Sequence, residues 1–163
     1  MIPWLPDIIE LDTYEGDWNA YLQAVYAIFL KDFVHNKPVF RGQRLGLKKY
    51  PEFDGKSATF WHFISEGAVE DKRTPDLRRC ERIGWPAPVI HNSTDSLVRC
   101  WENTRKGDRR IVLWLVPEDY VVVLSKRDGY LLPWTAYILS NQHSKDKLGR
   151  EYQAYKKAKG SPF

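Results

Sequence analysis

The sequence predicts an α+β fold in which N-terminal helices pack on one face of a small antiparallel sheet of about four strands, with a helix at the C-terminal end. Two observations predict it. Apolar residues recur at three- and four-residue spacing in the first part of the chain. Residues 109–139 instead form three short apolar runs, separated only by turns.

Length and composition favour one globular domain spanning 1–163. The chain has 163 residues, 43% of them hydrophobic and 14% aromatic, which excludes a disordered protein. Its two cysteines are far apart and lack a CxxC neighbour, so we expect reduced thiols in an intracellular protein. No leader peptide or membrane-spanning run is visible, and we therefore expect a cytoplasmic protein with no membrane partner.

Charge is unevenly distributed along the chain, although the formal net charge is only +4. Residues 1–20 carry five acids and no Lys or Arg, whereas residues 71–110 carry ten Lys or Arg against six acids. Residues 141–163 carry six Lys or Arg against two acids. Such segments indicate a polyanionic partner, and solvated basic helix faces are an equally good explanation.

The first half of the chain begins with an irregular acidic lead-in, residues 1–16, which contains two prolines. Asp17 is a suitable N-cap for a core helix over about 18–34. Residues 37–42 are typical of a short strand or connector and precede a turn-rich stretch. The run ATFWHFIS, residues 58–65, has strand composition because it is rich in aromatic and β-branched residues.

Two helices and a meander are predicted next. Thr74 and Pro75 predict the start of a helix that ends at Gly84, and residues 93–104 are typical of a second one. Short connections make the three runs after residue 109 antiparallel neighbours. Pro133 marks the third as an edge strand or a bulged one.

The last predicted element is a basic helix over about 144–158. In order, the segments TFWHFIS, RRCERIGWPAPVI, RRIVLWL…EDYVVVLSKRDGYLLPWTAYIL and KLGREYQAY resemble the phage-associated BECR-fold ribonucleases over residues 37–157. This superfamily includes barnase, EndoU, the tRNA-cutting colicins and the RelE toxins. The resemblance implies N-terminal helices before a four-stranded antiparallel sheet and metal-independent RNA cleavage, often by a toxin. Pro133 interrupts the third strand of this pattern, and the acidic lead-in lies outside it.

His62 is the candidate catalytic acid or base, because imidazole exchanges a proton near neutral pH. Strand alternation would place it on one face with Phe60 and Ile64. A histidine on an apolar element can equally be a packed, hydrogen-bonded core residue, and the sequence leaves both readings open.

Arginines of the 74–84 helix are the candidate phosphate ligands. Arg79 and Arg82 share a helix face at three-residue spacing, and their planar guanidinium groups suit a phosphate clamp in catalysis. Arg78, beside them, is a candidate for RNA binding. A solvated basic face is the alternative interpretation.

Thr135 and Tyr137 project from one face of the third meander strand, where they could position a phosphate or a 2′-hydroxyl group; core packing is the alternative. Lys145, Lys147 and Arg150 are expected to bind RNA through long-range attraction.

The predicted function is that of a toxin-like, metal-independent endoribonuclease. The four histidines of the chain lack the spacing typical of metal ligands, so neither a metal nor another cofactor is expected. The expected partners are RNA, including tRNA or ribosome-associated RNA, and an antitoxin or immunity protein. Two alternatives are a non-enzymatic phage factor that binds nucleic acid or protein on the same fold, and a nuclease fold without activity.

Overall fold

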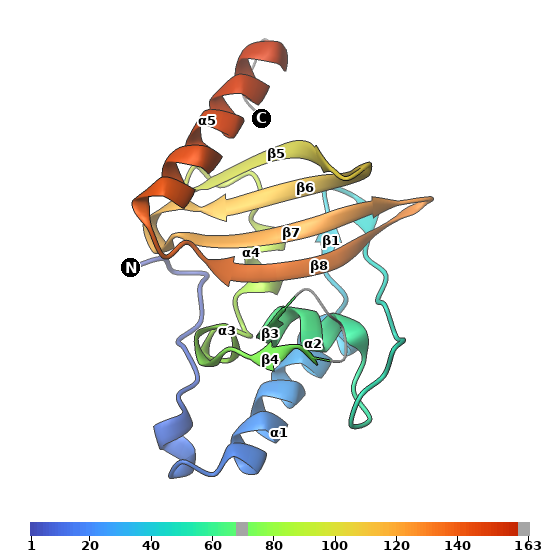
Figure 1. Cartoon of the computed structure of the whole chain (residues 1–163), viewed down its shortest axis with the longest axis vertical. Coiled ribbons are helices and arrows are strands. Elements are labelled where there is room, and N and C mark those ends of the chain that lie inside the picture. Colours follow the sequence, from blue (N-terminus) through green and yellow to red (C-terminus); the bar gives the residue numbers. More distant parts are fainter. Residues whose placement is uncertain (68–71, 160–163) are drawn as a thin grey trace.

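An antiparallel sheet of four strands forms the centre of the protein in the computed structural model, which describes residues 1–67 and 72–159 (Figure 1). Its strands follow one another in chain order: β5 (Val98–Arg105), β6 (Asp108–Leu115), β7 (Tyr120–Arg127) and β8 (Tyr130–Ile138). Within these described residues the α-helices are α1 (Trp18–Phe29), α2 (Ala58–Ile64), α3 (Leu77–Glu81), α4 (Pro86–His91) and α5 (Gln142–Lys159). The α+β class, the antiparallel meander and the C-terminal helix are therefore confirmed.

Short elements connect these larger ones. A π-helical turn continues α1, two 3₁₀ turns precede α1 and β7, and two small hairpins flank α2. Their bounds are Leu11–Tyr14 and Val116–Glu118 for the 3₁₀ turns, Leu30–His35 for the π turn, β1 (Val39–Phe40) with β2 (Gln43–Arg44), and β3 (Ser65–Glu66) with β4 (Thr74–Pro75). Asp17 caps α1 as predicted, since its carboxylate accepts a hydrogen bond from the amide of Ala20 at 3.2 Å.

The prediction of a strand at residues 58–65 is wrong, because this segment is the helix α2. Ser57 caps it by accepting a hydrogen bond from the amide of Phe60. The ring of Phe60 then packs edge-on against Phe29 of α1, and Phe63 packs against the same ring. Aromatic residues favour strands because strands usually bury them, and here a helix–helix contact buries them instead.

The predicted helix at residues 93–104 is also wrong, because residues 98–105 form β5. A two-residue turn joins β5 to β6: Arg105 pairs with Asp108, and both Lys106 and Gly107 have positive φ angles. That conformation is the one a tight hairpin between twisted strands requires. The polar residues before the turn favoured a helix, so this hairpin was not predicted.

The arginine-bearing helix begins later than predicted. Thr74 and Pro75 form the strand β4, and the N-cap of α3 is Asp76, whose carboxylate accepts a hydrogen bond from the amide of Arg78 at 2.9 Å. Since α3 ends at Glu81, Arg82 lies at its C-cap rather than within it. Arg79 and Arg82, which were predicted to share one helix face, therefore do not lie on the same regular helix.

Pro133 produces both features predicted for it, since β8 is an edge strand and carries a bulge. Pro133 pairs with Leu124 and Thr135 pairs with Val123, which leaves Trp134 without a partner residue in β7. A proline cannot donate a ladder hydrogen bond, so an edge position next to a bulge accommodates it. A bulge changes the direction of the side chain that it leaves unpaired, which here is Trp134 on the edge strand.

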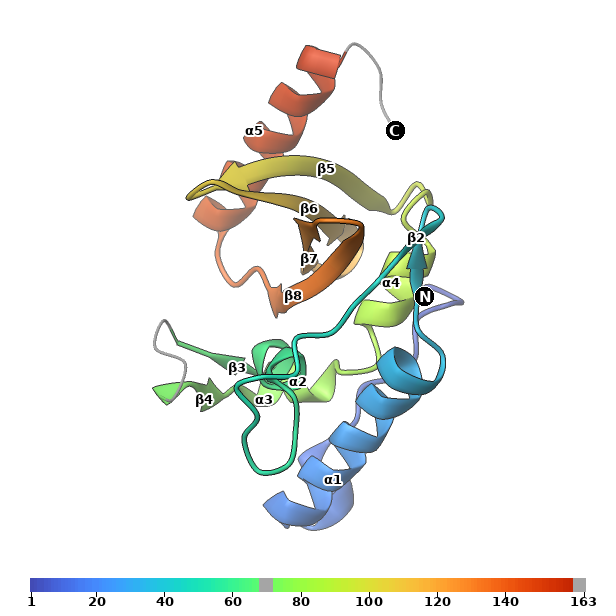
Figure 2. The same ribbon diagram turned by 90° about the vertical axis from the view of Figure 1, so that its right-hand side faces the viewer.

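Helices cover both faces of the sheet rather than the predicted single face (Figure 2). The row Cys100–Leu113–Val122–Ala136 crosses the four strands on the face that packs against the N-terminal helices. The row Trp101–Val112–Val123–Thr135 lies on the opposite face, where Leu148 and Tyr152 of α5 pack. The basic residues of the last helix therefore stand beside the sheet.

Among the described residues, no helix has both the length and the apolar character needed to cross a lipid bilayer.

Candidate functional site

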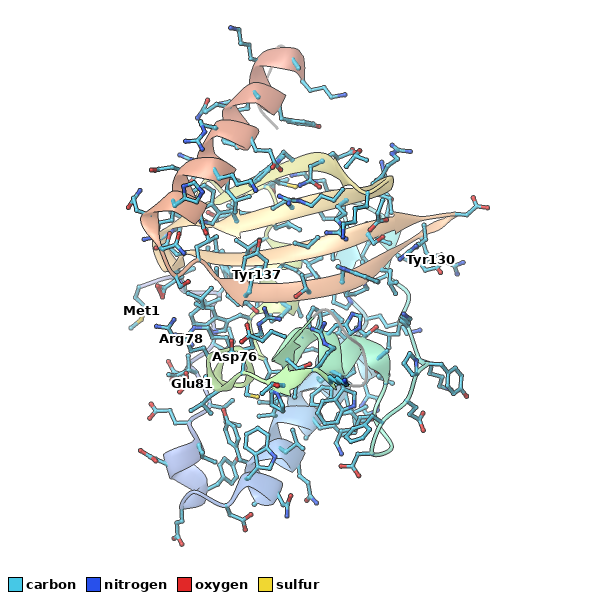
Figure 3. All side chains as sticks on the ribbon, viewed as in Figure 1. Met1, Asp76, Arg78, Glu81, Tyr130 and Tyr137 are labelled. Atoms are coloured by element: carbon cyan, nitrogen blue, oxygen red, sulfur yellow. The ribbon has the colours of Figure 1, made fainter. Side chains whose placement is uncertain are left out.

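A cleft of about 520 Å³ lies on the α5 face of the sheet, between the start of α5, the edge strand β8 and α3. We call it the sheet-face cleft. Helix α5 begins beside this face and then rises away from the sheet (Figure 1), and its residues Leu148 and Tyr152 pack on the face. Figure 3 shows Asp76 and Arg78 beside the end of β8 that carries Tyr137.

Cationic side chains dominate the lining of the sheet-face cleft. Five of them, from α3, from the β5–β6 hairpin and from α5, face two carboxylates. The cations are Arg78, Arg79, Arg105, Arg110 and Lys147, and the carboxylates are Glu66 and Asp76. A concave, positively charged surface attracts anions and raises their local concentration. The charge of the lining is therefore net positive, which favours anions.

Arg79 is the least exposed of these five cations. One of its terminal nitrogens, Nη1, donates to the carbonyl oxygen of Ser65 at 2.7 Å and to Thr135 Oγ1 at 3.4 Å. Its Nε lies 3.7 Å from a carboxylate oxygen of Asp76, and its guanidinium carbon lies 5.9 Å from the centre of the Tyr137 ring. Only 13% of the side chain is exposed. Arg79 is therefore a desolvated cation whose orientation is set before any ligand arrives.

Thr135 and Tyr137, predicted as positioning residues, both line the sheet-face cleft. They lie on the same side of β8, since Thr135 pairs with Val123 and Tyr137 pairs with Val121. Burial raises the pKa of Tyr137 above its ordinary value, while the guanidinium groups of Arg105 and Arg79 act in the opposite direction. Tyr137 consequently keeps its proton at neutral pH and can donate a hydrogen bond.

The β5–β6 hairpin supplies three cleft residues that sequence reasoning missed: Asn103, Arg105 and Arg110. Asn103 donates through Nδ2 to a carboxylate oxygen of Glu151 on α5 at 2.7 Å, and Trp101 donates to the same oxygen at 2.8 Å. These bonds fasten α5 to the sheet. The turn dipeptide Lys106–Gly107, just before the apolar run at residues 111–115, was the signal that could have revealed the hairpin.

The basic residues predicted on α5 separate into two groups. Lys147 lines the sheet-face cleft. Lys145 instead forms an ion pair with Asp119 at 2.7 Å, and Arg150 is exposed outside the cleft lining. Only Lys147 is placed to contact an anion bound in the cleft.

Arg82, the second predicted phosphate ligand, does not line the sheet-face cleft. Its Nη1 donates to the carbonyl oxygen of Arg78 at 3.1 Å and to Glu81 at 3.2 Å. Its guanidinium carbon lies 5.1 Å from the centre of the Trp85 ring. Arg82 thus faces the N-terminal part of the molecule.

His62 lies on α2, with 6% of its surface exposed, and is absent from the cleft lining. Its ring packs edge-on against Trp134, with 5.1 Å between the ring centres. Because α2 is a helix, the strand alternation expected for His62, with Phe60 and Ile64 on its face, does not apply. Its carbonyl oxygen is 3.5 Å from Thr135 Oγ1, so the residue lies just behind the cleft wall. Its catalytic role remains a prediction.

Within residues 1–67 and 72–159, no three His, Cys, Asp or Glu side chains come together in a group able to hold a metal ion. Comparison of the chain with known protein families, with curated proteins and with solved structures found no match. The fold and the site define an α+β protein with a positively charged cleft on one face of an antiparallel sheet.

Proposed function

We propose that the protein is an endoribonuclease that cleaves RNA in the sheet-face cleft without a metal ion. One observation carries the proposal: Arg79, Thr135 and Tyr137, predicted as catalytic residues from distant parts of the sequence, line one cleft together with the predicted RNA ligands Arg78 and Lys147. An RNA backbone is a polyanion, and arginine binds phosphate through two parallel hydrogen bonds.

The proposed reaction is attack of a 2′-hydroxyl oxygen on the adjacent phosphorus. A base removes the 2′ proton, the bond from phosphorus to the 5′-oxygen breaks, and an acid protonates that oxygen. The products are a 2′,3′-cyclic phosphate and a free 5′-hydroxyl group. Arg79 stabilises the charge that grows on the phosphoryl oxygens, because its fixed, desolvated position requires no reorganisation.

Two cleft residues suit the proton transfers. Glu66 is exposed at the rim and is a carboxylate suited to act as the base. Asp76 is less suited, because it caps α3 and pairs with Arg79. Tyr137 keeps its proton and is placed to protonate the leaving oxygen. His62, one layer behind Thr135, is the competing candidate for either transfer.

The wider role follows the resemblance. We assign the protein a BECR-like fold and a toxin-like role in the cytoplasm, with tRNA or ribosome-associated RNA as substrate. An antitoxin or immunity protein would then act by covering the sheet-face cleft. The N-terminal helices on one face of an antiparallel meander support this assignment.

A second candidate function is RNA binding without cleavage. It is favoured by the absence of a histidine from the described residues that line the sheet-face cleft, since imidazole is the most common acid–base group at neutral pH. Binding requires only the cations and neutral hydrogen-bond donors of the cleft.

Incubation of the purified protein with single-stranded RNA in EDTA separates these functions. The proposal predicts fragments that end in 2′,3′-cyclic phosphate, loss of cleavage in Glu66→Gln and Tyr137→Phe, and little change in His62→Gln. A requirement for added divalent metal would contradict it. Intact RNA with salt-dependent binding would favour the non-enzymatic function.

A further inference from the structure

A second group of cations surrounds the indole ring of Trp134, outside the deep part of the sheet-face cleft. Lys48 Nζ lies 5.8 Å from the ring centre, and the guanidinium carbons of Arg110 and Arg127 lie at 5.9 and 5.6 Å. We call these four residues the Trp134 cluster. They come from the loop before α2, from β6, from β7 and from the bulge of β8, so the fold brings together four separate segments.

The backbone of Lys48 and the side chain of Arg110 are anchored, and the cations of the Trp134 cluster are only partly neutralised. Lys48 is anchored through its backbone, because its amide donates to Thr59 Oγ1 at 2.8 Å and its carbonyl oxygen accepts from the Thr59 amide at 3.1 Å. Arg110 forms an ion pair with Asp108 at 2.9 Å. Within the described residues, Lys48 and Arg127 form no ion pair.

Three cations around one ring repel one another, although each is attracted to the face of the indole. Asp108 pairs with Arg110 and its charge also acts on Arg127, so one carboxylate offsets only part of three positive charges. An anion bound among them would relieve that repulsion and gain several charge-assisted hydrogen bonds. Lys48, Arg110 and Trp134 are half-buried and Arg127 is exposed, so solvent reaches the cluster.

Arg110 connects the Trp134 cluster to the sheet-face cleft, because it lines the cleft and lies over Trp134. Thr135, on the cleft wall, is the next residue in β8. Figure 3 shows Tyr137 at one end of β8 and Tyr130 at the other, and Trp134 lies between them in sequence. A chain of phosphates that leaves the cleft along β8 toward the Tyr130 end would therefore pass the cluster.

We propose that the Trp134 cluster is a second phosphate-binding site, which holds the backbone of a single-stranded RNA beyond the nucleotide bound in the cleft. This inference rests on the proposed function and adds the substrate class: a single strand several nucleotides long that follows β8. Indole and guanidinium groups are suited to single strands, whose phosphates and bases are accessible. The length of the ligand then determines how many of these cations it reaches.

Binding of fluorescent, 2′-O-methylated RNA tests the site, since that modification removes the attacking hydroxyl. A dinucleotide is compared with an oligonucleotide of about ten nucleotides, a length within the range of single-strand sites. Arg127→Gln and Lys48→Gln should each weaken binding of the longer RNA and lower the slope of log affinity against log salt by about 0.7. The loss should be much smaller with the dinucleotide.

Arg109→Gln is the matched control. Arg109 neighbours Arg110 in β6 but is exposed and lies near Glu102, with 3.8 Å between its Nη2 and the carboxylate. Its replacement changes the net charge equally and should leave the slope nearly unchanged. If all three variants behave alike with both RNA lengths, the second site is overturned, even where RNA is cleaved. The same holds if the wild type binds no RNA, or if polyglutamate competes equally well at matched charge.

If the longer RNA shows the Arg127 and Lys48 dependence and unmodified RNA is not cleaved, the second site stands and the proposed nuclease activity fails. One set of proteins, tested with the two methylated RNAs and with unmodified RNA, thereby separates the two proposals.

Discussion

Arg79→Gln should lower the single-turnover rate of RNA cleavage at saturating RNA by about 10²- to 10³-fold, or about 2.7–4 kcal/mol of transition-state stabilisation. The magnitude follows from the position of Arg79. Its side chain is 13% exposed and already bonded to the Ser65 carbonyl oxygen, so little reorganisation is needed for its charge to act on a phosphate in the cleft. Gln retains some hydrogen bonding and removes the charge.

Arg82→Gln is the control for this experiment, because the surroundings of Arg82 match those of Arg79 closely. Each guanidinium donates to a backbone carbonyl oxygen, lies beside a carboxylate and packs over an aromatic ring. Both variants should therefore lose a similar free energy of unfolding, about 1.5–3 kcal/mol for a hydrogen bond to a charged group. Only Arg79 lines the sheet-face cleft.

Quenched-flow cleavage of a labelled RNA, with urea denaturation of each variant in parallel, measures both quantities. We expect the two variants to lose a similar free energy of unfolding, and only Arg79→Gln to cleave RNA more slowly. Equal slowing in the two variants would refute the role of Arg79, because the effect would then follow stability rather than contact with the phosphate.

Three further predictions concern the scaffold and its charges. Glu151→Leu removes the acceptor of two hydrogen-bond donors on β5 and should lower the free energy of unfolding by about 1–3 kcal/mol. The control Arg150→Leu, on the exposed side of α5, should change the free energy of unfolding by less than about 0.5 kcal/mol. Equal effects of the two variants in urea denaturation would contradict this prediction. Burial would raise the pKa of Asp108, but hydrogen bonds from a guanidinium and a hydroxyl group outweigh it and hold the pKa below its ordinary value. Asp108 should thus stabilise the fold above the pKa of the unfolded carboxyl, and its advantage over Asp108→Asn should vanish as pH falls through the folded pKa; a gap that persists in strong acid would refute this. Burial raises the pKa of Cys80 and of Cys100 to about 12, so neither thiol should react with iodoacetamide at pH 8 before unfolding, and rapid labelling of native protein would show the packing to be wrong.

The sequence predicted the elements whose pattern is set locally. The antiparallel meander after residue 109 could be predicted from the sequence, because connections this short can join only antiparallel neighbouring strands. The edge position and bulge at Pro133 could be predicted because a proline cannot donate a hydrogen bond to a neighbouring strand. The N-cap role of Asp17 could be predicted because an N-cap residue bonds to an amide within the first turn of its helix.

Elements set by tertiary packing were not predictable in the same way. The composition of α2 favours a strand, and its helical form depends on contact with Phe29 and Phe33 of the preceding segment. The reverse applies to β5, whose polar residues favoured a helix until pairing with β6 fixed them in the sheet. Since His62 lies on one of these misassigned elements, its expected orientation was wrong as well.

The candidate site shows the same division. Thr135 and Tyr137 were predicted on one strand face, and both line the sheet-face cleft. Arg79 and Arg82 were predicted together, but the capping of α3 by Asp76 and its end at Glu81 separate them. The β5–β6 hairpin depends on a strand pairing, and its local signal, the Lys106–Gly107 turn, was outweighed by the helix predicted for residues 93–104.

The sheet-face cleft as the RNA site can be tested most directly by mapping amide chemical-shift changes during titration with a 2′-O-methylated RNA. We predict that the largest changes fall on residues 76–79, 103–110 and 135–147, with few on α1. A competing location exists in the groove of about 470 Å³ between residues 3–9 and Ile28, Lys31 and Asp32. Changes concentrated in that groove, with the sheet-face cleft unaffected, would contradict the assignment of the RNA site.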